Sequence, residues 1–219
     1  MTDVRDNCRR VMERIHNAAV KSRRDPASIR LIAVTKTVEP ARIREAVETG
    51  IRDLGENRLQ EALGKQDLLS DLPLTWHFIG HLQSNKAKKV VERFQVVQSV
   101  DRSELAERLN QSATGRLPVF IEVELGNEST KSGVPEKDLP ELLAKVQQME
   151  RLEVRGLMAI PPLGEDPQDS RKYFVRLREL GSRFQLPELS MGMSHDYEVA
   201  IEEGATMVRV GTALFGRRQ

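Results

Sequence analysis

The strongest constraint on the fold is an alternation of two kinds of segment along the chain. Eight short runs rich in Val, Ile and Leu, bounded by polar residues or glycine, have the pattern of buried parallel strands. They span residues 31–35, 51–54, 76–79, 96–100, 119–123, 154–158, 189–191 and 207–210. The segments between them have the pattern of amphipathic helices, and residues 4–19 predict an additional helix before the first strand. Eight such units favour a closed barrel, because eight parallel strands close around a filled interior.

Capping and helix-breaking residues mark several of the predicted helices. Pro40 is placed to begin one helix and Gly50 to end it. Asp101 and Glu104 have the spacing of a capping box at the head of another helix. Pro135 precedes a helix whose apolar side chains share one face, namely Leu139, Leu142, Leu143 and Val146.

We therefore expect one α/β domain over residues 1–219, a single (β/α)8 TIM barrel with an extra N-terminal helix. A chain of 219 residues suffices for one well-filled core and is short for two domains. A doubly wound open sheet is the alternative, but no G-x-G-x-x-G fingerprint follows the first predicted strand. Residues 161–167 contain prolines and a glycine, and we expect them to form the most flexible loop.

Charge and composition weigh against several classes of protein. The chain has 34 basic and 33 acidic residues, without the basic excess of a nucleic-acid binder. The one basic concentration, Lys86, Lys88 and Lys89, is explained more simply as a solvated helix face than as a polyphosphate or RNA site. No apolar run approaches the roughly 20 residues of a membrane helix, and the polar N-terminus does not resemble a secretory signal. Cys8 is the only cysteine and the four histidines lack metal-binding spacing, so we expect a cytoplasmic protein without a metal site.

Chemically versatile residues follow the predicted strands at the point where each strand ends. In a closed barrel all these ends meet on one rim, where the active sites of barrel enzymes are built. The pattern predicts a site at this rim. The residues concerned are Lys36, Glu56, Asn57, His81, Gln83, Ser99, Asp101, Ser194 and Arg209.

Two of these strand ends have the composition of a phosphate site. Gly192 and Ser194 follow the seventh strand, Gly211 and Thr212 follow the eighth, and each pair leads into a short helix. Glycine lets backbone N–H groups approach an anion, hydroxyl groups add donors, and a helix N-terminus favours negative charge. The alternative is that Ser194 and Thr212 merely cap helices.

Lys36 has the placement of a reactive lysine, at the end of the first strand. Burial or a neighbouring cation makes a lysine nucleophilic, and Arg209 on the adjacent eighth strand could supply that cation. A lysine at such a position is more commonly a surface or ion-pair residue. Combined with a phosphate site on the same rim, however, Lys36 favours a phosphorylated aldehyde, of which pyridoxal 5′-phosphate (PLP) is the obvious one.

Longer motifs at these positions resemble a known family. They are residues 33–36 (AVTK), 55–57 (GEN), 76–86 (WHFIGHLQSNK), 189–196 (LSMGMSHD) and 208–216 (VRVGTALFG). Through them the chain resembles, almost end to end, the YggS/PROSC family of PLP-binding homeostasis proteins, whose barrel is similar to the N-terminal domain of alanine racemase. The resemblance implies a Schiff base between PLP and Lys36. The other cofactor-binding residues that it implies are Asn57, Met193, Ser194, Arg209, Gly211 and Thr212.

The resemblance also implies roles for these residues. Ser194, Gly211 and Thr212 would hold the phosphate, with Met193 in the same loop, and Asn57 would lie near the face of the cofactor ring. Arg209 would face the pyridine nitrogen, and because arginine keeps its proton, that nitrogen should stay unprotonated. The ring would then be a poor electron sink.

Three functions compete. We expect a PLP-binding protein of intracellular PLP (vitamin B6) and amino-acid homeostasis, without catalytic turnover; the alternative is a PLP-dependent amino-acid racemase. Racemisation needs one acid/base group on each face of the substrate α-carbon. In alanine racemase-like enzymes the group on the second face is a tyrosine from a C-terminal domain. Only residues 212–219 follow the last predicted strand, and neither Tyr173 nor Tyr197 lies at a strand end.

A weak racemase-like activity stays open, and a third class, an aldolase using Lys36 without PLP, would not need the phosphate loops and Arg209. Candidate partners are amino acids and PLP-dependent apoenzymes. We expect a monomer, and neither nucleic acid nor membrane as a partner.

Overall fold

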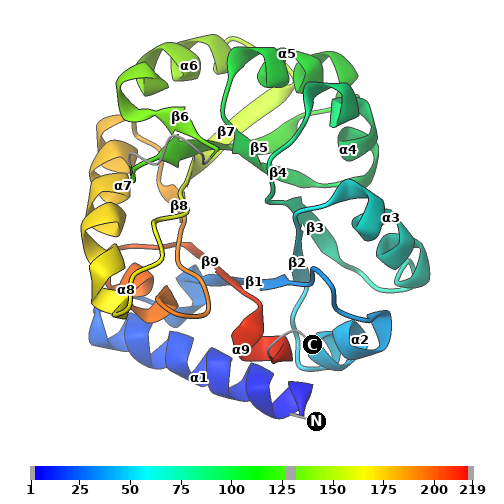
Figure 1. Cartoon of the computed structure of the whole chain (residues 1–219), viewed down its shortest axis with the longest axis vertical. Helices are drawn as coiled ribbons and strands as arrows, with labels where there is room; N and C mark the ends of the chain where they lie inside the picture. The colour runs from blue at the N-terminus through cyan, green and yellow to red at the C-terminus, as the bar shows by residue number, and fades with distance from the viewer. Residues whose placement is uncertain (1–2, 127–131, 217–219) are drawn as a thin grey trace.

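The computed structural model describes residues 3–126 and 132–216, and within them eight parallel strands close into a ring. Each strand pairs with its neighbour in the chain, and the ring is completed by pairing of the first strand with the last. Helices surround the ring on the outside (Figure 1). The predicted TIM barrel is confirmed. Its strands are β1 (Arg30–Val34), β2 (Asp53–Glu56), β3 (Thr75–Phe78), β4 (Val96–Val100), β5 (Leu117–Glu124), β7 (Leu152–Met158), β8 (Glu188–Ser190) and β9 (Met207–Val210).

The outer layer consists of helices that follow the strands, plus one helix that precedes them. That first helix is the predicted N-terminal addition, and it runs along the outside of the barrel beside the last helix (Figure 1). A two-residue strand, β6 (Val134–Pro135), pairs with β5 outside the ring. The helices are α1 (Val4–Lys21), α2 (Pro40–Glu48), α3 (Leu59–Leu68), α4 (Ala87–Arg93), α5 (Ser103–Ser112), α6 (Leu139–Val146), α7 (Arg171–Arg183), α8 (Tyr197–Glu202) and α9 (Thr212–Phe215). Short 3-10 turns are η1 (Pro26–Ser28), η2 (Ser84–Lys86), η3 (Glu136–Asp138) and η4 (Pro167–Ser170).

The predicted strand boundaries hold within two residues, and one helix-capping prediction fails. Strand β2 begins at Asp53 rather than at Ile51, because its pairing with β1 sets Asp53 opposite Ile32. The capping box at Asp101 is wrong, since Arg102 is the N-cap of α5 and makes no side-chain cap. The Asp101 carboxylate instead accepts a charge-assisted hydrogen bond from Arg102 Nη1 at 2.6 Å.

Side chains from alternate strand positions fill the barrel interior. Its apolar part is one cluster of buried residues: Ile32, Val96, Phe120, Met158 and Met207. The intervening positions face the helices and form the much larger outer core. Both faces of each strand are therefore buried, which explains why the strands appear in the sequence as almost uninterrupted apolar runs.

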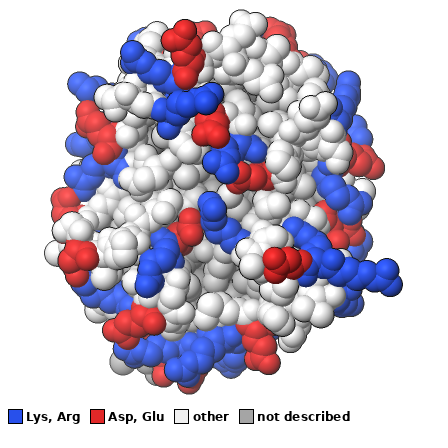
Figure 2. Space-filling view, turned by 180° about the vertical axis from the view of Figure 1, so that it is seen from behind, with Lys and Arg blue, Asp and Glu red and all other residues white. Residues whose placement is uncertain are grey.

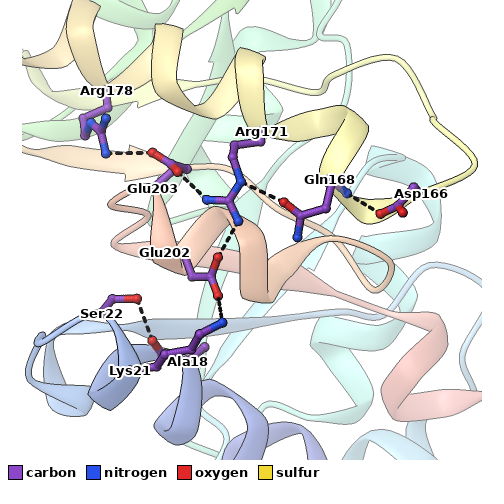
Figure 3. Close-up of polar contacts among 9 residues, drawn as sticks. All are labelled: Ala18, Lys21, Ser22, Asp166, Gln168, Arg171, Arg178, Glu202 and Glu203. Atoms are coloured by element: carbon purple, nitrogen blue, oxygen red, sulfur yellow. Dashed lines mark hydrogen bonds and ion pairs between the residues drawn. The ribbon is translucent and has the colours of Figure 1, made fainter.

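Helix α1 is held to the barrel by a buried hydrogen bond and by surface ion pairs. Asn7 Nδ2 donates to the carbonyl oxygen of Leu214 in α9 at 2.8 Å. At its other end, Lys21 pairs with Glu202 of α8 at 2.7 Å, and Arg171 of α7 bonds to both Glu202 and Glu203 (Figure 3). The contacts tie the first helix to the elements that follow β7, β8 and β9.

The surface carries both signs of charge close together. Lys and Arg side chains are interspersed with Asp and Glu over the face shown in Figure 2, and neither sign covers it alone. Within the described ranges, no helix is long and apolar enough to cross a membrane.

Candidate functional site

The carboxyl ends of β1, β2, β8 and β9 place the predicted site residues on one rim of the barrel. The backbone N–H of Thr35 donates to Gly55 O at 3.1 Å, which puts Lys36 beside Asn57. On the other side of β1, Ala33 pairs with Val210, and a Cβ at Gly211 would lie 3.3 Å from Val34 O. Lys36, Asn57 and Gly211 therefore belong to one neighbourhood.

Lys36 lies half-buried at the point where the chain turns out of β1. The next residue, Thr37, has a φ of +60°, and its N–H donates to the Glu61 carboxylate. The residue before it, Thr35, is fully buried and donates its hydroxyl to Glu56 Oε1 at 2.7 Å. Anchors on both sides thus fix the backbone that carries Lys36.

A buried lysine, Lys65 of α3, completes these anchors. Its Nζ donates to Glu56 at 2.8 Å, to Glu61 at 2.6 Å and to the carbonyl oxygen of Thr35 at 2.5 Å. Burial raises the pKa of Glu56, although hydrogen bonds from Lys65 and Thr35 oppose that shift. Partial burial also acts to raise the pKa of Glu61, but the bonds from Lys65 and Thr37 outweigh it and lower that pKa. Glu56 is thus turned towards α3 as a structural group, away from the rim site where the sequence placed it.

The loops after β8 and β9 are joined by the Ser194 side chain. Its hydroxyl oxygen accepts hydrogen bonds from the backbone N–H groups of Gly211 at 3.1 Å and Ala213 at 3.2 Å. Ser194 thus caps the helix of the neighbouring strand, and Thr212 is the first residue of α9 rather than its N-cap. Two backbone N–H groups and a hydroxyl thus lie together here, and a phosphate oxygen could replace Ser194 Oγ as the acceptor of the two N–H groups.

The β8 loop needs a glycine and is held by Asp196. Gly192 has a φ of +90°, and a Cβ there would lie 2.5 Å from Cβ of Ala200. The buried Asp196 accepts a hydrogen bond from the N–H of Met193 at 2.7 Å, which leaves Met193 half-buried in the loop. Asp196 therefore orders this loop through a bond to its backbone.

Arg209 is the buried cation of the site. It is 3% exposed, and it donates to Ser190 Oγ at 2.7 Å and to the carbonyl oxygen of Ala159 at 2.9 Å. Burial lowers its pKa to about 10, against the opposing charges of Glu122 and Asp196. Arg209 therefore remains a cation at neutral pH.

A directional chain of hydrogen bonds, which we call the interior chain, leads from Arg209 through the barrel. Ser190 Oγ donates to Gln98 Oε1 at 2.7 Å, and Gln98 Nε2 lies 3.0 Å from His77 Nδ1. His77 Nε2 lies 2.8 Å from Asp53 Oδ1. Because the Gln98 amide nitrogen can only donate, His77 Nδ1 must accept, and the His77 proton sits on Nε2 facing Asp53. His77 is fully buried and links Gln98 to Asp53 in this chain.

Glu122, near the end of β5, is a titratable group that the sequence analysis missed. It is 3% exposed and accepts a hydrogen bond from the Ser132 hydroxyl at 2.8 Å. Burial raises the pKa of Glu122 to about 7, and the negative charge of Asp101 raises it further. The hydrogen bond from Ser132 and the positive charge of Arg209 lower this pKa and so offset part of the rise. The signal was present, since Glu122 interrupts the apolar run 119–123 as Gln98 interrupts the run 96–100.

These residues fit a phosphate-bearing aldehyde. The rim combines one lysine, one buried arginine, and a serine that bridges two backbone donors of the next loop. Asn57 Oδ1 is buried, and in the described part of the chain it has no hydrogen-bond partner, so an acceptor at the site is unsatisfied. No group of three or more His, Cys, Asp or Glu in residues 3–126 and 132–216 is arranged to hold a metal ion.

Comparison with known proteins gives matches over the whole chain. The family model described as alanine racemase, N-terminal domain, matches residues 4–219. The pyridoxal phosphate homeostasis protein of Pseudomonas aeruginosa is 50% identical, over 100% of this chain and 97% of its own length. That of Escherichia coli is 42% identical, over 100% of this chain and 98% of its own.

Solved structures give the same result at two levels of similarity. PipY of Synechococcus elongatus, solved with PLP bound, is 43% identical, with a TM-score of 0.83 over 94% of this chain and 100% of its own. The alanine racemase of Corynebacterium glutamicum is 16% identical, with a TM-score of 0.73 over 98% of this chain and 61% of its own. The second likeness concerns the fold alone.

Proposed function

Because the chain belongs to the alanine racemase N-terminal domain family, in the branch of the pyridoxal phosphate homeostasis proteins, we propose that it binds PLP at the mouth of its barrel. The observation that carries the proposal is the joining of Ser194 to the backbone N–H groups of Gly211 and Ala213, on the rim that bears Lys36. The likeness to PipY, whose structure contains PLP, supports it.

Each predicted site residue has a role that its position supports. Lys36 attaches the cofactor aldehyde as a Schiff base, while Ser194, Gly211 and Thr212 hold the phosphate. Met193 would shape the loop that carries Ser194, and Asn57, whose buried Oδ1 has no partner among the described residues, would lie beside the ring. When bound, PLP supplies an aldehyde that reacts with amines and a ring that can accept electrons.

We propose that this protein carries PLP in PLP and amino-acid homeostasis and does not turn over a substrate. Arg209 carries this part of the proposal: its guanidinium, with a pKa of about 10, would face the pyridine nitrogen as the proton donor and would leave that nitrogen unprotonated. The tyrosine positions agree. Tyr197 is 1% exposed on α8, beneath the Arg14 guanidinium at 5.4 Å, and Tyr173 lies on α7, so both sit in the helical layer.

The experiment that tests binding is a PLP titration followed by visible absorption. We expect a Schiff-base band in the parent protein and in Lys88→Ala, which removes an exposed lysine of α4. Lys36→Ala should lack the band while keeping the far-ultraviolet circular dichroism of a folded barrel. A band of normal intensity in folded Lys36→Ala contradicts the assignment of Lys36.

Carriage and racemisation are separated by hydrogen exchange at the α-carbon. The PLP-loaded protein is incubated in D2O with L-alanine and other amino acids, and the α-proton signal is followed by NMR. Carriage predicts exchange no faster than with free PLP at the same concentration. Rapid exchange accompanied by formation of the D-isomer would establish the racemase alternative.

The remaining parts of the proposal concern the setting of the protein. We place it in the cytoplasm, as one domain over residues 1–219, and as a monomer that exchanges PLP with apoenzymes or senses amino acids. The one cysteine, Cys8, is buried as a free thiol against the barrel, which suits a reducing compartment.

A further inference from the structure

A pocket lies beside the barrel mouth, between the start of α3 and the segment that joins β3 to α4. Its volume is about 310 Å³, at the lower end of the range for small-molecule sites. The helices α3 and α4 that border it are neighbours in the outer layer (Figure 1). Asn57 forms part of its wall, so the pocket adjoins the rim that carries Lys36.

The ionisable side chains that line this pocket are basic. They are Arg58, His81, Lys86 and Lys89, and no Asp or Glu belongs to the lining. Two carboxylates lie near the lining: Asp101 is 3.6 Å from His81 and also bonds Arg102 at 2.6 Å, and Glu61 bonds Lys65 at 2.6 Å. The lining thus concentrates positive charge without an acidic residue of its own.

Lys86 and Lys89 differ from several other surface cations in having no carboxylate partner among the described residues. Arginines such as Arg44, Arg93 and Arg176 each lie against a carboxylate. Neither lysine makes an ion pair or a side-chain hydrogen bond with any residue in the described ranges. Grouping cations around a concave site raises the local concentration of anions, and a bound dianion would relieve their mutual repulsion.

The polypeptide backbone adds donors at the same place. Leu59 and Gln60, the first two residues of α3, line the pocket, and the N-cap residue Arg58 makes no side-chain cap. The N–H groups of a first helical turn have no acceptor within the helix. They reinforce the preference for an anion that the side chains already create.

The pocket also has an apolar floor. Phe78 and Leu82 are each 2% exposed, and the Phe78 ring stands edge-on against Phe94 with centroids 5.2 Å apart. Because both side chains are almost fully covered by protein, this floor offers a ligand van der Waals contact rather than a large hydrophobic area. A ligand with an apolar body beside its charged group would make that contact.

We propose that this pocket is a binding site for a phosphate monoester with a small apolar or aromatic body. Such an ester is close to a dianion at neutral pH, which suits a lining with Arg58, Lys86 and Lys89. Arg58 would hold the phosphate oxygens with its planar fork, the two lysines would act as point charges, and Phe78 would contact the organic part. The pocket shares Asn57 with the proposed PLP site, but Lys36 does not line it, and the proposal does not depend on the function proposed above.

The test is calorimetric titration of the PLP-saturated protein with phenyl phosphate, with inorganic phosphate as the comparison. Phenyl phosphate should bind with a dissociation constant in the millimolar range or tighter, and inorganic phosphate more weakly because it makes no van der Waals contact with Phe78 and Leu82. The double variant Lys86→Ala/Lys89→Ala should raise the dissociation constant about tenfold or more, since charge-assisted bonds are lost. Higher ionic strength should weaken binding in the same direction.

Lys88→Ala is the matched control, because Lys88 lies on the same helix but lines a different depression with Glu104 and Arg108. Its dissociation constant should stay within about twofold of the parent value. The proposal is overturned by an equal loss in Lys88→Ala, by no binding to the parent, or by equal affinity for the two phosphates. It is also overturned if phenyl phosphate displaces PLP, which the visible band would report. Should PLP fail to bind at all, the same titration on the protein alone still tests the pocket.

Discussion

At the scale of single residues, Glu122 and Arg209 show how the barrel interior changes ordinary side chains. Both are almost fully buried, and burial favours the neutral form of each. Arg209 tolerates this because it donates to Ser190 and to Ala159 O. Glu122 has the Ser132 hydroxyl as its hydrogen-bond donor among the described residues, so its pKa rises to about 7. The carboxyl can therefore change charge near neutral pH while the guanidinium does not.

Glu122 should make stability depend on pH. Its pKa is about 7 in the folded chain against an ordinary value of 4.5, so between these values the folded state binds more protons than the unfolded state. Stability from this group is fully present below pH 4.5 and is lost as the pH rises through 7. Between pH 4.5 and 8 we expect the free energy of unfolding of the parent protein to fall by on the order of 3 kcal/mol more than that of Glu122→Gln. Urea unfolding at each pH measures both values. Parallel stability–pH profiles for the two proteins would contradict this assignment.

Ser194 should contribute to the affinity for PLP. Ser194→Ala removes one hydroxyl from the phosphate loops, and Thr212→Ala removes another. Each should weaken PLP binding by about 1–3 kcal/mol, because charged phosphate oxygens lose a donor. Dissociation constants from the PLP titration provide the measurement, with Thr206→Ala as a control in which a hydroxyl bonded to Leu189 N is lost away from the loops. Unchanged constants in both loop variants are incompatible with the phosphate assignment.

At the scale of elements, α1 supports the site through α9. The N–H of Gly211 and of Ala213 can meet an anion only if α9 keeps its place, and Asn7 of α1 holds α9 by its bond to Leu214 O. The N-terminal helix was predictable from its apolar spacing, but this bond was not, because it joins residues 207 positions apart. Local patterns encode helices and strands, whereas bonds between distant elements depend on how the elements are assembled.

The same distinction accounts for the other successes and failures of prediction. Runs of buried residues located the strands of the ring, since every strand is covered on both faces. The two-residue β6 has too few residues for any pattern, and the start of β2 follows from pairing rather than from hydrophobicity. Site residues at strand ends could be predicted because barrel closure brings all such ends together. The role of Lys65 could not be predicted, because it arises from contact between α3 and the turn after β1.

Asn7→Ala tests the support of α9. The substitution leaves the buried Leu214 carbonyl without its donor, and we expect the free energy of unfolding to fall by about 1–3 kcal/mol in urea titrations. Asn110→Ala is the matched control, because Asn110 also bonds a backbone group, Arg151 N, but at the surface. Asn110→Ala should lower the free energy of unfolding by about 0.5 kcal/mol or less. Equal costs for the two variants would contradict a special role for Asn7.

At the scale of the whole molecule, the interior chain connects the mouth of the barrel to the opposite end. It begins at Arg209, passes through Ser190, Gln98 and His77, and ends at Asp53 near the start of β2. Its members come from five different strands, so the guanidinium orientation depends on the complete ring. A charged group at the mouth is thus positioned by residues spread over most of the chain length.

Gln98→Leu should break this chain in the middle at nearly constant volume. Ser190 loses its acceptor and His77 loses its donor, so the free energy of unfolding should fall by about 2–4 kcal/mol. Ser190→Ala combined with Gln98→Leu should then cost less than the sum of the two single variants, by about 0.5–3 kcal/mol. Urea unfolding of the four proteins measures this coupling, and strict additivity would show that the residues act independently.

The central claim, that Lys36 holds PLP, is tested most directly by borohydride reduction of the PLP-loaded protein, followed by proteolysis and mass spectrometry. Reduction fixes a Schiff base as a stable pyridoxyl-lysine, so the modified peptide identifies the residue. The account predicts a single stoichiometric label on Lys36, together with loss of the visible band. A label on another lysine, or no label after saturation with PLP, would contradict it.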